Sequence, residues 1–292
     1  MEYTSKLGLY APAMSAEQVA EQVSRIEKLA VKNRTEEVYK MCYSAIDLTT
    51  LNCTDSDASV RAFAEKAVRF GSEFRGIPDV ASICVYPLFV DVVGLALGGS
   101  NIAITSVAGG FPSSQTFLEV KILEVAMAVE SGADEVDIVI NVGELLGGEF
   151  ERMANTVEAI RTEMGDDTVL KVIIESGALK TPQAIRDASL LAMMAGADFV
   201  KTSTGKIDVA ATPEAAVVMC TAIKDYYEKT GRMVGFKAAG GVRTAEEAAL
   251  YYTIVETILG EKWLTPRLFR IGASSLANNL LSVIVGRTVK YY

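Results

Sequence analysis

Short hydrophobic runs alternate with longer amphipathic stretches from about residue 44 to the end of the chain. The runs are rich in β-branched residues, which is typical of buried parallel strands, and the longer stretches suit the helices that connect such strands. The eight runs span residues 44–50, 80–87, 102–107, 135–141, 169–175, 198–203, 233–238 and 269–274. Eight strand and helix units within about 250 residues predict an α/β fold of the closed (β/α)8, or TIM, barrel type.

An open, doubly wound sheet is the alternative that the same alternation allows. Such a sheet normally carries a GxGxxG turn early in the chain, after its first strand. No such turn is present near the first runs of this chain. The closed barrel is therefore the favoured architecture.

A helical segment precedes the first run. Residues 15–33 start with Ser15, a residue type that caps helices, and repeat apolar residues at helical spacing. We therefore expect an N-terminal helical extension over residues 1–40 and a catalytic barrel domain over residues 41–292. The extension is interpreted as a packing element without a chemical role.

Length and charge narrow the class of protein further. A chain of 292 residues that is 50% hydrophobic can bury the core of one large domain. Its 28 basic and 37 acidic residues give a net charge of −9, which argues against a nucleic-acid partner. Any phosphate group that the protein binds must therefore be held locally.

The chain contains no histidine at all. Catalytic triads with an imidazole base and histidine-ligated metals are therefore excluded. The four cysteines (Cys42, Cys53, Cys84 and Cys220) lie far apart without a CxxC pair, so they suggest reduced thiols. No secretory leader or membrane span is apparent, and we expect a cytoplasmic protein without membrane or nucleic-acid partners.

Charged residues interrupt several of the apolar runs. They are Asp47, Asp137, Lys171, Glu175, Lys201 and Lys237. A lone buried charge is costly, but several that meet inside a barrel can neutralise one another. Catalytic groups of this fold gather at the carboxyl ends of the strands, so these residues predict the active site.

The segment DFVKTSTGK places Lys201 inside an apolar strand. Burial lowers the affinity of a lysine for its proton, and the neutral amine is the form that attacks a carbonyl carbon. A lysine that extends from a strand end into solvent is the alternative interpretation. From this segment alone, both interpretations remain open.

Two later segments suggest a phosphate site. VGFKAAGGVRT places Lys237 in a strand, and Gly240 and Gly241 follow it, as they also would in a simple turn. GASS places Ser274 and Ser275 at the start of the last helix, where they are either ordinary caps or phosphate ligands. The loops after strands seven and eight are the usual phosphate position in this barrel, which favours phosphate binding.

GADEVDIVIN places Asp137 within the fourth run. A carboxylate near two lysines can carry protons, and it can equally serve as a buried counter-ion. Asp47 and Lys171 are candidates for the same network.

The motifs IDLTTLN, ICVYP, GADEVDIV, LKVIIE, DFVKTSTGK, VGFKAAGGVRTAEE and GASSL follow one another between residues 44 and 285. In this series the chain resembles the deoxyribose-phosphate aldolase family. The resemblance implies a class I aldolase that needs no metal or cofactor. It would reversibly cleave 2-deoxy-D-ribose 5-phosphate, a small phosphorylated sugar aldehyde, to glyceraldehyde 3-phosphate and acetaldehyde.

The same resemblance implies roles for individual residues. Lys201 matches the Schiff-base lysine, and Lys237 and Asp137 match the groups that transfer protons. Further active-site positions match Asp47, Lys171 and the terminal residue Tyr292, which some members carry into the site on a mobile tail. The implied phosphate site consists of Gly205, Lys206, Gly240, Gly241, Gly272, Ser274 and Ser275.

Three features depart from the family pattern. Ala238 stands where proline is more common, the N-terminal extension is longer than in short members, and GGFPSSQT lacks HGN-type residues. None of them affects a proposed proton-transfer group, so they bear on substrate preference and loop rigidity.

Other functions and the assembly state remain open from the sequence. Another Schiff-base barrel, such as a transaldolase or keto-acid aldolase, would keep Lys201 but need different substrate groups. A non-catalytic phosphosugar-binding protein is the second alternative. A homodimer is a possible assembly.

Overall fold

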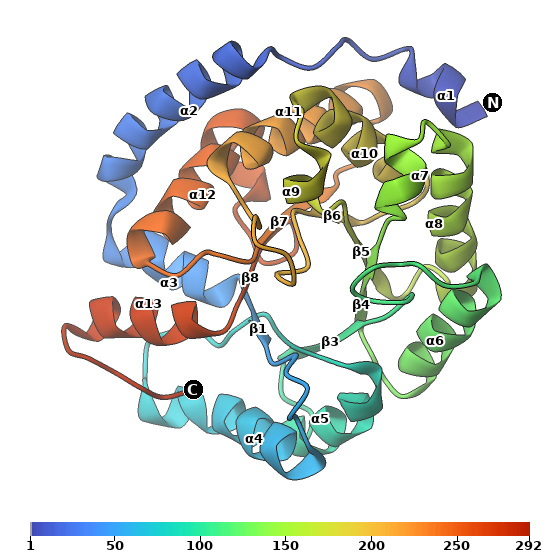
Figure 1. The fold of residues 1–292 in the computed structure, drawn as a ribbon. Coiled ribbons are helices and arrows are strands. Elements are labelled where there is room, and N and C mark those ends of the chain that lie inside the picture. Colours follow the sequence, from blue (N-terminus) through green and yellow to red (C-terminus); the bar gives the residue numbers. More distant parts are fainter. Residues whose placement is uncertain (1) are drawn as a thin grey trace.

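Eight parallel strands form a closed barrel in the computed structural model, which describes residues 2–292 (Figure 1). The strands pair in chain order, and β8 closes the barrel against β1. They are β1 Ile46–Thr49, β2 Ser82–Val85, β3 Ala103–Val107, β4 Glu135–Val139, β5 Val169–Ile173, β6 Phe199–Lys201, β7 Gly235–Ala239 and β8 Phe269–Ala273. The predicted barrel is confirmed, and the open sheet is excluded.

Each hydrophobic run of the sequence contains one of these strands. Seven strands lie wholly within the predicted runs, and β7 extends one residue further, to Ala239. Most runs extend beyond their strands at one or both ends. Lys201 is the last residue of β6, whereas the other clustered charges of the predicted site lie within their strands.

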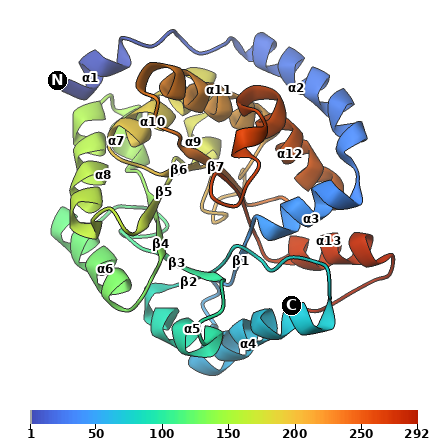
Figure 2. The same cartoon turned by 180° about the vertical axis from the view of Figure 1, so that it is seen from behind.

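A ring of helices surrounds the barrel (Figures 1 and 2). The longer ones are α4 Asp57–Glu73, α5 Val90–Leu97, α6 Leu118–Glu130, α8 Phe150–Met164, α10 Pro182–Met194, α11 Pro213–Thr230, α12 Ala245–Leu259 and α13 Ser275–Val285. Short elements are α7 Val142–Leu146, α9 Ser176–Leu179, η1 Val31–Asn33, η2 Pro87–Phe89 and η3 Glu261–Trp263. Within the described residues, no helix has the length and apolar character to cross a bilayer.

The N-terminal segment contains α1 Glu2–Leu7, α2 Ala16–Ala30 and α3 Glu36–Ser44. Its first two helices run around the outside of this ring, and α3 lies between α12 and α13 (Figure 1). As predicted, Ser15 caps α2, here with a capping box to Gln18. Val19, Val23 and Ile26 are buried on the face of α2 that packs against α11 and α12. The extension therefore shares its core with the barrel helices.

Candidate active site

Asp137 lies between two lysines inside the barrel. Its Oδ2 atom is 2.6 Å from Lys201 Nζ and 2.7 Å from Lys237 Nζ. The strand register pairs Lys201 of β6 with Lys237 of β7, and Asp137 of β4 with Lys171 of β5. Lys171 Nζ is 3.1 Å from the other carboxylate oxygen, Oδ1. The structure thus brings these four predicted residues together.

A second set of charges lies beneath this cluster. Lys237 and Lys171 both contact Asp47, whose Oδ1 atom is 2.5 Å from the guanidinium of Arg270 on β8. Arg270 also binds Glu135 Oε1 at 2.6 Å, and Glu135 Oε2 is 2.5 Å from Lys171 Nζ. The sequence interpretation had not assigned Arg270 and Glu135 to the site. Both residues are charges within an apolar run, which is the sequence feature that identified the lysines.

This buried cluster contains one more cation than anions. The cations are Lys171, Lys201, Lys237 and Arg270, and the anions are Asp47, Glu135 and Asp137. A charge that has no full counter-ion in a low-dielectric interior is disfavoured, and a titratable group then loses it. Releasing one proton from a lysine would leave the cluster neutral.

The pKa directions identify which lysine releases that proton. Burial lowers the pKa of Lys201, the ammonium of Lys237 lowers it further, and Asp137 only partly opposes both. Burial also opposes the charge on Lys237, but Asp137 and Asp47 outweigh it and raise that pKa. Burial opposes the charge on Lys171 as well, and carboxylates again raise the pKa. Lys201 is therefore the amine of the cluster that is most readily neutral.

A cavity of about 310 Å³ opens above the cluster at the carboxyl ends of β6, β7 and β8. Of the three clustered lysines, Lys201 alone lines it, although only 4% of its surface is exposed. All seven predicted phosphate ligands also line it: Gly205, Lys206, Gly240, Gly241, Gly272, Ser274 and Ser275. Arg243, which the sequence interpretation had missed, lines the same cavity and adds a cation.

The wall of this cavity depends on glycine. Gly240 has a φ of +80°, and a Cβ atom there would lie 2.6 Å from Ala210 Cβ. A Cβ atom on Gly272 would lie 2.9 Å from Ala239 Cβ and 3.2 Å from Lys237 Cε. Gly272 therefore also makes room for the second lysine.

The last helix begins at the edge of the cavity. Ser274 precedes α13 and makes no capping hydrogen bond with its side chain, so no serine cap satisfies the first amides of this helix. Free amides at a helix start are a general anion-binding feature. The cavity combines them with Lys206 and Arg243, so it can hold a phosphate group close to Lys201.

Tyr292 lies away from the clustered lysines. The C-terminus runs along the outer side of the molecule near α4 and α13 (Figures 1 and 2). The Tyr292 ring stacks on Phe70 and meets Phe63 edge-on, and its hydroxyl is 3.5 Å from that of Tyr43. Asn278 of α13 holds its backbone through two hydrogen bonds. In this structure the predicted tail tyrosine belongs to an aromatic cluster outside the barrel.

The structure combines a closed barrel, a lysine with a lowered pKa beside a bridging carboxylate, and a cavity that can hold a phosphate group. These features together are typical of a lysine-dependent aldolase. Comparison with protein families agrees, since the model of the DeoC/LacD aldolases matches residues 41–280. The chain belongs to the DeoC/LacD family of aldolases. The class I aldolase function predicted from the motifs is thereby confirmed. Among residues 2–292, no His, Cys, Asp and Glu side chains are grouped as they would be to hold a metal ion.

Individual relatives cover most of the chain. It is 44% identical over 246 residues to the deoxyribose-phosphate aldolase of Mus musculus, covering 80% of this chain and 77% of the relative. It is 38% identical over 292 residues to the deoxyribose-phosphate aldolase of Homo sapiens, covering 96% and 90%. A solved structure of the Aeropyrum pernix deoxyribose phosphate aldolase, described as a tetramer, has the same fold. Its TM-score is 0.67 at 24% identity, covering 88% of this chain and 96% of that one.

Proposed function

We propose that this aldolase reversibly cleaves 2-deoxy-D-ribose 5-phosphate to glyceraldehyde 3-phosphate and acetaldehyde through a Schiff base on Lys201. One observation carries the proposal. The buried cluster has one surplus cation, and the lysine whose pKa is lowered there is also the clustered lysine that lines the cavity. The names of the mouse and human relatives support the substrate.

In the proposed reaction, neutral Lys201 adds to the aldehyde carbon of the open-chain sugar. Loss of water gives an iminium, which withdraws electrons from the bond between C2 and C3. Removal of the proton from the C3 hydroxyl then releases glyceraldehyde 3-phosphate and leaves an enamine. Protonation and hydrolysis of the enamine release acetaldehyde and restore the lysine.

Asp137 is positioned for the proton transfers. One of its oxygens accepts hydrogen bonds from both Lys201 and Lys237. A proton can therefore pass between the two amines through a single carboxylate atom. Asp47 and Lys171 hold Lys237 and Asp137 in place from below.

The cavity wall would bind the substrate phosphate. We assign this role to Lys206, to the amides of Gly240 and Gly241, and to the start of α13 at Ser274 and Ser275. Gly205 and Gly272 give the chain the close approach that such a site needs. This arrangement places the phosphate at one end of the cavity and the aldehyde carbon at Lys201.

Reductive trapping tests this assignment. Acetaldehyde with borohydride should add one ethyl group at Lys201 and abolish cleavage, and the label should be absent from a Lys201→Leu variant. Lys121 is a matched control because it is buried, with a pKa that burial lowers, but lies on α6. Lys121→Met should be labelled at Lys201 as before. A label at Lys206 or Lys237 in the native protein would overturn the proposal.

We further propose that the protein is a homodimer. Several large apolar side chains are exposed on η2, on α5, and on α6 with the residue before it: Leu88, Leu95, Phe117, Val120, Leu123 and Met127. Val120, Leu123 and Met127 share one face of α6, and η2 packs against this helix. Grouped exposed apolar side chains are typical of an interface between subunits.

For the cellular role, we propose deoxyribonucleotide catabolism in the cytoplasm. The proposed substrate is the sugar phosphate of a deoxynucleotide, and its cleavage yields two small aldehydes. The free cysteines of the described chain suit a reducing compartment.

A further inference from the structure

Glu175 follows β5 in an unusual backbone conformation. Its φ of 52° and ψ of 57° are left-handed, a region that non-glycine residues seldom adopt. The side chain is 5% exposed, and no cation among residues 2–292 forms an ion pair with it. Such a buried carboxylate and such a backbone persist only where the surrounding structure holds them.

The carboxylate of Glu175 binds both donors of Thr204. The Thr204 amide donates to Oε1 at 3.1 Å, and the Thr204 hydroxyl donates to Oε2 at 2.6 Å. A hydroxyl has one hydrogen, so this bond leaves its lone pairs free to accept elsewhere. The Lys206 amide donates to that same hydroxyl oxygen at 3.0 Å. Glu175 thereby fixes the direction of a hydrogen-bond chain that ends at Lys206.

This chain of bonds runs through the wall of the cavity. Thr204, Gly205 and Lys206 all line it, next to Lys201. Lys206 Nζ reaches across and donates to the carbonyl of Leu51 at 2.6 Å. The loop that would bind the substrate phosphate is thus attached at its base to Glu175, which itself does not line the cavity.

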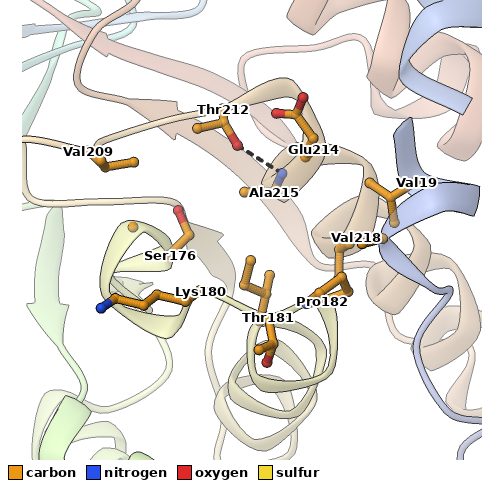
Figure 3. Close-up of a pocket in the computed structure, with 13 residues that line it drawn as sticks. Val19, Ser176, Lys180, Thr181, Pro182, Val209, Thr212, Glu214, Ala215 and Val218 are labelled. Atoms are coloured by element: carbon orange, nitrogen blue, oxygen red, sulfur yellow. Dashed lines mark hydrogen bonds between the residues drawn. The ribbon is translucent and has the colours of Figure 1, made fainter. Parts of the chain in front are cut away.

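The residues after Glu175 hold the same loop at two more points. The Ser176 amide donates to the carbonyl of Thr202 at 2.8 Å. A Cβ atom on Gly177 would lie 2.0 Å from the carbonyl oxygen of Val209, so the two backbones are in direct contact. Figure 3 shows Ser176 on α9 and Val209 on the loop side by side at the edge of a second pocket. The left-handed turn at Glu175 is what brings this segment beneath the loop.

We propose that Glu175 is a positioning residue that sets the phosphate-binding loop of Thr204 to Lys206 for the substrate. The proposal rests on the proposed function and deepens it, since it concerns how the same site selects a phosphorylated sugar. Loss of the carboxylate leaves the Thr204 hydroxyl undirected and the Lys206 amide without a fixed acceptor. Binding of the phosphate weakens, while the lysines below are untouched.

Three variants test this. Glu175→Gly removes the carboxylate and suits the left-handed backbone, so backbone strain cannot explain its effect. It should raise KM for 2-deoxyribose 5-phosphate, and the inhibition constant of inorganic phosphate, about tenfold. Cleavage of unphosphorylated 2-deoxyribose should change less than about threefold. Glu175→Gln should be intermediate, because its single amide oxygen can accept from only one of the two Thr204 donors. Thr204→Val removes that hydroxyl and should resemble Glu175→Gly.

Lys180→Gly is the matched control. Lys180 lies on the same segment with a φ of +60°, whereas the side chain of Thr204 bonds to Glu175 and the Lys206 amide. Its replacement by glycine should leave KM for the phosphorylated sugar unchanged. Equal losses for both sugars in Glu175→Gly, or an unchanged KM in Thr204→Val, would overturn the proposal. If Glu175→Gly does not fold, the KM of Thr204→Val for the phosphorylated sugar alone tests the proposal.

The two proposals can fail separately. Acetaldehyde labelling of Lys201 needs no phosphate, so it should persist in every variant. Intact labelling with an unchanged KM would refute the role of Glu175 alone. Absence of labelling in the native protein would refute the proposed Schiff base instead.

Discussion

Lys201 and Lys237 lie on neighbouring strands and bind the same oxygen of Asp137, yet their pKa values move in opposite directions. The difference lies in the number of carboxylates. Lys237 also contacts Asp47, whereas Lys201 has Asp137 alone and faces the cavity. This difference fits the roles proposed for them, with Lys201 as the nucleophile and Lys237 as a lysine that stays protonated.

Arg270 should stabilise the protein because it neutralises two buried carboxylates. Arg270→Met leaves Asp47 and Glu135 without this partner, and the free energy of unfolding should fall by about 3–5 kcal/mol in urea titrations. The exposed Arg69 pairs with the exposed Glu65 one helical turn away. Arg69→Met should therefore cost less than about 1 kcal/mol. Equal costs would show that burial of the Arg270 pairs is unimportant.

The loss in Arg270→Met should also depend on pH. Burial opposes ionisation of Asp47 and Glu135, but the neighbouring cations hold the pKa of both carboxyls below the usual range. Their contribution to stability is present above the unfolded pKa, near 4, and is lost as the pH falls towards the lowered folded values. The stability difference between native and variant should therefore narrow on acidification, and a constant difference would contradict this account.

At the scale of elements, the strands were predictable because each is a local run of β-branched residues. The charges of Arg270 and Glu135 were visible in the runs, but their pairing with each other was not predictable. Glu135 begins the fourth run and Arg270 lies in the eighth, and only barrel closure brings β8 beside β1 and within reach of β4. The position of Tyr292 could not be predicted from the sequence either, since it depends on how α3, α4 and α13 pack together.

The start of α13 offers a direct test of the phosphate site. Ser274→Asp adds a negative charge where we place the phosphate, so KM for the phosphorylated sugar should rise at least about tenfold. Aspartate is itself a good cap, so the helix should remain stable. Unphosphorylated 2-deoxyribose should be affected much less, and Ser274→Ala is the uncharged control. Equal effects of Ser274→Asp on both sugars would show that no phosphate is held there.

At the scale of the whole molecule, the outer face of α6 exposes the apolar side chains of Val120, Leu123 and Met127. If α6 forms a dimer interface, sedimentation should give twice the chain mass of 31.3 kDa. Leu123→Arg should yield monomers, because a charge would be buried in the apolar contact. Val31 is exposed in η1, directly after α2, which lies across the barrel from α6 (Figure 1). It is the control, and Val31→Arg should stay dimeric. A native monomer, or a dimer that survives Leu123→Arg, would contradict this interface.

In the proposed function, the surplus cation of the buried cluster accounts for the reactivity of Lys201. The pH dependence of single-turnover imine trapping tests this account most directly. A free lysine has a pKa of about 10.4. In the native protein the trapping rate should rise with pH to a plateau, with a midpoint below that value, since burial and Lys237 lower the pKa of Lys201. Lys237→Leu removes one cation and balances the cluster, so the midpoint should move up by about one unit or more. A native midpoint near 10.4, or one that does not move in Lys237→Leu, would contradict the account.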